Sequence, residues 1–153
     1  MAATAPPTDP IVAFFNQTAP HADALGFTFV RMDGDAYIYR MDWREELVGN
    51  PDSGSLHSSV IFSFLDSVMG YSTVLAVAPE RSTATMDLRV DYTRASQPGR
   101  AVEVRVECYR VARKVAFARG VAYHDDPAEP LATAQGAFMI YDTPPEWLQR
   151  GAS

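Results

Sequence analysis

One carboxylate lies inside a long apolar run of this sequence. Between Ser58 and Ala78 the chain has no proline, and Asp66 is the only acidic residue. Apolar side chains cover most of the circumference of a helix drawn through this run, which is typical of a buried helix. A carboxylate in such a helix is a candidate general base, because a positioned side chain can take a proton from a reacting group.

The small and polar residues of this run follow one line along the predicted helix. Their spacing alternates between four and three residues, so they share one face; they are Ser59, Ser63, Asp66, Gly70 and Thr73. Two interpretations stay open. In one, this stripe faces water and Asp66 is a solvated charge. In the other, the stripe lines a cleft or a subunit interface and Asp66 is the reactive group.

The start of the same helix offers a second kind of chemistry. Its free backbone N–H groups lie at the positive end of the helix dipole and can stabilise an oxyanion. Asn50 and His57 lie just upstream, and Asp66 lies eight residues beyond Ser58, roughly 12 Å along a helix. One small group cannot contact both ends of that distance, so the spacing predicts a homodimer in which a second copy supplies the carboxylate.

The elements that must position these residues predict an α+β domain. Residues 26–42 form a predicted hairpin around Asp33-Gly34, because an Asp-Gly pair tolerates the positive φ of a tight turn. The long helix is expected to end before Pro79. Four alternating segments then predict a four-strand antiparallel meander. Small residues share one side of the last two strands, which favours a sheet curled closely around the helix. The four segments are STATMDLRVDY, AVEVRVECYRV, KVAFARGVAY and LATAQGAFMIY.

The length of 153 residues is that of one domain. We expect residues 1–8 to be a flexible tail, residues 9–145 to form the domain and residues 146–153 to be a second tail. Asp9-Pro10 is a helix-start signal, and Gly26 is the expected stop of the short segment PHADAL.

Composition argues against several classes of partner. The formal net charge is −6, so a wide basic face for nucleic acid is not expected. The single cysteine, Cys108, cannot form an intrachain disulfide. The sequence shows no secretory signal, and serines and Asp66 interrupt the apolar run, which argues against a membrane span. We therefore expect a cytoplasmic protein, and the lack of a Cys/His cluster predicts no metal site.

Together these motifs resemble those of the hotdog-fold acyl-CoA thioesterases, in the branch like the phenylacetate-pathway (PaaI-like) thioesterase. That branch carries an asparagine, a glycine, a His-Gly-Gly triplet that opens the central helix, and an acid eight residues after the first glycine of the triplet. The matching residues are Asn50, Gly54, His57-Ser58-Ser59 and Asp66. The strand segments TMDLRVDYTRASQPG and ATAQGAFMIY also look like those of the family, so the similarity covers roughly residues 25–141.

The resemblance implies an antiparallel sheet wrapped around one long central helix, and a homodimer that often joins into a homotetramer. It implies hydrolysis of an acyl-CoA thioester between subunits, with coenzyme A as part of the substrate and no other cofactor. Asp66 would activate water or attack the carbonyl, Ser58 N–H and Asn50 would hold the oxyanion, and Thr85 would orient the water. Further residues expected near the substrate are His57, Ser59, Ser63, Arg94, Arg113 and Lys114.

The triplet departs from the family pattern, because His57-Ser58-Ser59 places two side chains where the thioester would approach. A second hypothesis is therefore a non-catalytic hotdog protein that binds an acyl or aromatic CoA ligand. A third, a hotdog lyase or dehydratase, is less favoured, since those enzymes pair a histidine with an acid on the helix and residues 58–78 hold no histidine. The acyl group stays open, as does the choice between coenzyme A and an acyl carrier protein.

Overall fold

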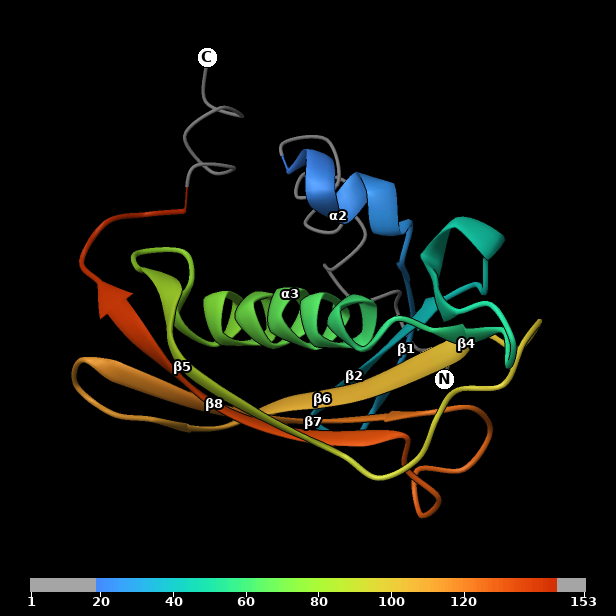
Figure 1. The fold of residues 1–153 in the computed structure, drawn as a ribbon. Helices are drawn as coiled ribbons and strands as arrows, with labels where there is room; N and C mark the ends of the chain where they lie inside the picture. Colours follow the sequence, from blue (N-terminus) through green and yellow to red (C-terminus); the bar gives the residue numbers. More distant parts are fainter. Residues whose placement is uncertain (1–18, 146–153) are drawn as a thin grey trace.

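The computed structural model describes residues 19–145, and Figure 1 shows a curved sheet with one long helix lying across it. The helix expected from Asp9-Pro10 and the two expected tails, residues 1–8 and 146–153, lie outside the described residues. The elements are α2 (Pro20–Leu25), β1 (Thr28–Asp33), β2 (Ala36–Met41), the short 3-10 helix η1 (Glu45–Leu47), β3 (Val48–Asn50), β4 (Ser55–Leu56), α3 (Ser58–Val77), β5 (Ser82–Tyr92), β6 (Val102–Val111), β7 (Val115–Tyr123) and β8 (Ala132–Tyr141).

The main sheet has six antiparallel strands in the order β1-β2-β6-β7-β8-β5. The predicted four-strand meander is therefore wrong in one respect: β6, β7 and β8 follow one another, but β5 pairs with β8, with Leu88 opposite Gly136. Alternation of apolar and polar residues shows which face of a strand is buried but not which strand lies beside it. As a result β5 becomes an edge strand of the sheet.

Local signals for the other elements are confirmed. Gly34, between Asp33 and Ala36, has φ +59° in the β1–β2 turn. Gly26 closes α2 with φ +67°, and its N–H donates to the Ala22 carbonyl. α3 runs from Ser58 to Val77, as the unbroken apolar run predicted.

The small residues of β7 and β8 bring the sheet close to α3, as the sequence predicted. A Cβ at Gly120 would lie 3.0 Å from Leu65 Cδ2 and 3.3 Å from Met69 Sδ. Ala118, which neighbours Gly120 on this face, is fully buried. Contacts this short leave no room for a larger side chain, because interiors are close-packed. The core therefore lies between α3 and the concave face of the sheet.

The length and mean hydropathy of 1.7 would suffice for α3 to cross a membrane, and it is the one helix within residues 19–145 that meets this test. However, 56% of its apolar window is buried inside the fold, where it contacts β5, β6, β7 and β8. The core position accounts for its apolar character, since a helix surrounded by protein is apolar nearly all round.

Candidate active site

Asp66 and Thr85 meet between α3 and the edge strand β5. Thr85 Oγ1 donates a 2.8 Å hydrogen bond to Asp66 Oδ1, and two turns further along the helix Thr73 Oγ1 bonds Thr83 Oγ1 at 2.8 Å. The stripe of small and polar residues therefore runs along β5. A cavity of about 190 Å³ opens here, lined by Asp66, Gly70, Tyr71, Thr83, Thr85 and Phe138. We call it the carboxylate cavity.

The N-terminus of α3 is capped by His57, not by a serine. His57 has extended backbone angles, and its Nδ1 accepts the Ser59 N–H at 3.1 Å and lies 2.6 Å from Ser59 Oγ. Ser58 is the first helical residue, and within residues 19–145 every residue with positive φ is a glycine. The serines that replace the glycines of the family triplet therefore impose no backbone strain here, since only a positive φ would penalise them.

The segment before the cap packs closely against it. Asn50 lies at the end of β3, and its Oδ1 accepts the Asp52 N–H at 3.0 Å, which is typical of a turn stabilised by an asparagine side chain. A Cβ at Gly49 would lie 2.6 Å from His57 Cα and 2.9 Å from His57 Cδ2. Glycine at this position thus allows the chain beside Asn50 to contact the histidine that caps α3.

A second cavity, of about 340 Å³, lies beside the first turn of α3. We call it the helix-start cavity; residues along its wall include Leu56, Ser58, Ile61, Tyr92, Arg94 and Ser96. Ser58 and Asp66 are two helical turns apart, so the two cavities occupy different places along the same α3–β5 groove. In one copy of the chain, the carboxylate and the start of the helix do not line a common cavity.

Two residues of this second cavity were missed from the sequence. Tyr92 Oη donates a 2.8 Å hydrogen bond to the Ser58 carbonyl, and Ser96 Oγ accepts the Leu56 N–H at 2.8 Å. Partial burial raises the pKa of the Tyr92 hydroxyl, so it stays protonated and able to donate at neutral pH. The one available signal was that Tyr92 falls on the helix-facing side of its strand.

The candidate cations lie at opposite ends of the sheet. Arg94 follows β5 at the helix-start cavity and pairs with Glu129. Arg113 and Lys114 form the β6–β7 turn, at the end of the sheet where β5 begins. Lys114 pairs with Asp142, and this ammonium group lowers the pKa of the Asp142 carboxyl. Within one copy these residues cannot contact a common phosphate group.

The remaining predicted contact, Ser63, is half-buried on α3 between Ser59 and Asp66. Its carbonyl accepts a hydrogen bond of 2.8 Å from Ser67 Oγ. Ser63 belongs to the stripe of α3 that runs along β5. Among the predicted site residues, it is the one that lies between the helix-start cavity and the carboxylate cavity. No cluster of side chains suited to a metal ion occurs in residues 19–145.

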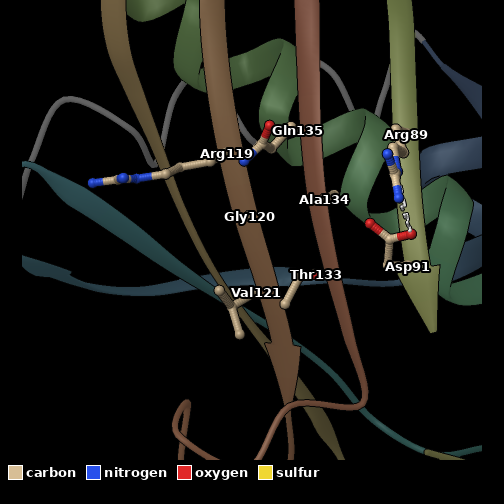
Figure 2. A pocket seen from close by; sticks show the side chains of 8 residues that line it. All are labelled: Arg89, Asp91, Arg119, Gly120, Val121, Thr133, Ala134 and Gln135. Carbon is tan, nitrogen blue, oxygen red and sulfur yellow. Dashed lines mark hydrogen bonds and ion pairs between the residues drawn. The ribbon is translucent and has the colours of Figure 1, made fainter. Parts of the chain in front are cut away.

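The outer face of the sheet, away from α3, carries a pocket of about 400 Å³ that contains none of these residues. Figure 2 shows that Arg89 is joined to Asp91 in an ion pair, while Arg119 points away from both. Arg119 pairs instead with Glu107. The two guanidinium groups therefore do not converge on a common ligand, and the candidate site remains on the helix side of the sheet.

Comparison with known proteins shows the family of the chain. The family model of the thioesterase superfamily matches residues 53–131, which span Asp66, Thr85 and the start of α3. No curated protein sequence matches the chain significantly. Among solved structures, a Pseudomonas aeruginosa protein is 37% identical with a TM-score of 0.73, and the match covers 84% of this chain and 95% of that one.

Two more distant structures share the fold. PaaI from the phenylacetic acid degradation operon of E. coli has 16% identity and a TM-score of 0.70, with 88% of this chain and 97% of that chain covered. A mutant PaaI of Thermus thermophilus has 19% identity and a TM-score of 0.66, with coverage of 78% and 97%. The hotdog fold and the PaaI-like resemblance predicted from the sequence are confirmed. The chain belongs to the thioesterase superfamily.

Proposed function

We propose that this protein hydrolyses an acyl-CoA thioester to the free acid and coenzyme A, with Asp66 as the general base. The observation that carries the proposal is the hydrogen bond from Thr85 to Asp66 Oδ1 beside the carboxylate cavity. Within residues 19–145 no side chain or N–H donates a hydrogen bond to Asp66 Oδ2, so this oxygen is free to accept a proton from water. A carboxylate that is oriented on one side and open on the other is suited to that role.

The reaction needs a second group to bind the charge that develops on the carbonyl oxygen. Asp66 takes a proton from water as the water oxygen adds to the carbonyl carbon; the C–S bond then breaks, and the proton passes to the departing CoA thiolate. The Ser58 N–H, at the positive end of the α3 dipole, and the side-chain amide of Asn50 are the proposed oxyanion donors. A general base contributes about 10²–10⁴-fold, and one oxyanion donor about 10²–10³-fold.

The separation of the two cavities supports a homodimer. Asp66 and Ser58 lie roughly 12 Å apart along α3, so we propose that each site takes its carboxylate from one copy and its helix N-terminus from the other. The free edge of β5 is the natural interface, since an unpaired strand edge can pair with another chain. Exposed apolar side chains flank this edge: Phe62 is 38% exposed, Met86 54% and Tyr92 45%.

The register of that interface follows from the two cavities. Thr85 marks the carboxylate cavity and Tyr92 marks the helix-start cavity. We place Thr85 opposite Tyr92 in an antiparallel pairing of β5 with its own copy. Because β5 has a bulge between Thr85 and Asp87, facing pairs beyond the bulge then have residue numbers that sum to 178, and the twofold axis passes through Arg89. A homotetramer of two such dimers, acting in the cytoplasm, is part of the same proposal.

The test is release of thiol from a panel of acyl-CoA thioesters by the wild type, Asp66→Asn and Asp66→Ala. We expect both variants to lose at least about 10²-fold in kcat, since they lack the general base. Asp35→Asn, in the β1–β2 turn, is the control that removes a carboxylate elsewhere and should match the wild type. Equal, measurable rates for Asp66→Ala and the wild type would reject Asp66 as the general base. No thiol release from the wild type would leave ligand binding without turnover as the function to measure.

A further inference from the structure

The end of β5 holds the start of α3 through a single side-chain hydroxyl. Tyr92 Oη donates its hydrogen bond to the carbonyl of Ser58, the first residue of the helix, at 2.8 Å. The two residues are 34 positions apart in the sequence, so the contact joins two separate elements. It lies beside the helix-start cavity, whose wall includes both residues.

The first N–H groups of α3 are not equivalent. The Ser59 N–H donates to His57 Nδ1, and the Val60 N–H donates to the His57 carbonyl at 3.0 Å. Within residues 19–145 the Ser58 N–H has no hydrogen-bond acceptor. This amide is therefore the donor left for a ligand at the start of the helix, since the first turn of a helix leaves its N–H groups without helical partners.

Two hydrogen bonds, one from β5 and one from the loop after it, hold the backbone before and after the Ser58 N–H. Ser96 is a buried polar residue, only 5% exposed, and its Oγ accepts the N–H of Leu56, two residues before Ser58. Tyr92 bonds the carbonyl of Ser58 itself. The backbone on both sides of the His57–Ser58 peptide is thus tied to β5 and the loop that follows it. The same strand carries Thr85, which orients the carboxylate.

We propose that Tyr92 is a positioning residue for the Ser58 N–H, and this inference rests on the proposed thioester hydrolysis. The hydroxyl of Tyr92 holds the first peptide of α3 so that the donor points at the oxyanion. Catalytic groups must be held within about 0.5 Å of the productive geometry. Loss of the hydroxyl should therefore lower kcat more than it raises KM, because the oxyanion contact is made in the transition state.

The experiment compares Tyr92→Phe with Tyr141→Phe. Tyr141, at the end of β8, is 50% exposed and lies opposite Ser82 at the far end of β5 from Tyr92, so it controls for loss of a hydroxyl from an exposed tyrosine. We expect Tyr92→Phe to lower kcat about tenfold, a part of the effect of one whole donor, with KM changed less than about twofold. Tyr141→Phe should match the wild type, and both variants should melt as the wild type does.

Amide hydrogen exchange provides a readout that does not depend on turnover. In Tyr92→Phe the N–H groups of Ser59 and Val60, which are hydrogen-bonded to His57, should exchange faster than in the wild type, while those in the middle of α3 should be unchanged. Wild-type kcat together with unchanged exchange in Tyr92→Phe would overturn the inference. If the wild type releases no thiol, the proposed function fails, and exchange alone then decides whether Tyr92 orders the start of the helix.

Discussion

The hydroxyl of Thr85 donates its hydrogen bond to Oδ1 of Asp66 and thereby links the edge strand to the middle of the central helix. This contact fixes which carboxylate oxygen faces β5 and which is left for other partners. Because Thr85 is 19 residues from Asp66, packing of the strand against the helix is what sets the orientation of the carboxylate.

Thr85→Val tests this orientation while nearly preserving the shape of the side chain. We expect kcat to fall about tenfold, since a base that is no longer held loses part of the roughly 10²–10⁴-fold that it supplies. Thiol release under saturating substrate measures the effect. Thr83→Val is the matched control, because Thr83 bonds Thr73 and not the carboxylate. An equal loss in the two variants would show that the hydroxyl of Thr85 has no special role.

Arg89→Cys tests the β5 interface. Arg89 is exposed and lies on the proposed twofold axis, so two copies should place their thiols within disulfide reach. In a background with Cys108→Ser, which removes the one native thiol, mild oxidation should give a covalent dimer on a non-reducing gel. Loss of the ion pair between Arg89 and Asp91 should have little effect, because exposed ion pairs are weak.

Val30→Cys in the same background is the control for that experiment. Val30 is 41% exposed and lies in β1, at the opposite edge of the sheet. It should stay monomeric on the gel after the same oxidation. Covalent dimers from Val30→Cys but not from Arg89→Cys would show that the dimer interface lies at β1. That result would contradict the proposed site shared across β5.

Tyr39→Phe should stabilise the protein. Within residues 19–145, Tyr39 Oη is the one buried side-chain polar atom without a hydrogen-bond partner, and the residue is fully buried. An unsatisfied buried hydroxyl costs about 1–3 kcal/mol, so we expect the free energy of unfolding to rise by about 1 kcal/mol in urea denaturation. Tyr123→Phe, which removes a bond to Glu103, should lower it by a similar amount. A loss in both variants would contradict this.

Alkaline pH should destabilise the fold. Burial raises the pKa of Tyr39 and of Tyr71 well above the ordinary value of 10.0, and neighbouring tyrosines add to the effect on Tyr39. Above about pH 10 the unfolded chain loses these phenolic protons while the folded chain keeps them. The unfolded state then binds fewer protons, so the free energy of unfolding falls as pH rises.

Urea denaturation between about pH 8 and pH 11 measures this fall, on either side of the ordinary tyrosine pKa. Stability should be nearly constant below about pH 10 and decline above it, towards the raised pKa values of the folded state. Tyr39→Phe should show a shallower decline than the wild type, since one of the shifted groups is absent. A wild-type curve that stays flat over the whole range would show that these phenols ionise as easily in the folded protein as in the unfolded one.

Elements with strong local signals could be predicted from the sequence. Gly34 after Asp33 and the unbroken apolar run of α3 determine their conformations through nearby residues alone. The neighbours of β5 could not be predicted, because its pairing with β8 joins Ser82 to Tyr141 across most of the second half of the chain. Such pairing depends on how the sheet closes around the helix, which no local pattern specifies.

The candidate site likewise contains residues that could be predicted from the sequence and residues that could not. Asp66 could be named from the apolar run and Thr85 from the resemblance, but the hydrogen bond between them was not predicted. Tyr92 and Ser96 act through the backbone of other segments, so their contacts could not be predicted, although the alternation of β5 places Tyr92 on the side that faces the helix. His57 caps α3, because it is the extended residue before the helix and its side chain accepts the Ser59 N–H.

The two-turn gap between Ser58 and Asp66 has a genetic consequence. If every active site is shared between subunits, the Asp66→Ala variant and the Asn50→Ala variant are each inactive as homodimers. The first lacks the carboxylate and the second lacks the oxyanion donor, so the two variants lack different halves of the site. Co-expressed, half of the assembled pairs would be mixed, and each mixed pair would rebuild one undamaged centre beside one doubly damaged centre. Two dead alleles would then restore about a quarter of normal turnover, which no enzyme with a self-contained centre could do.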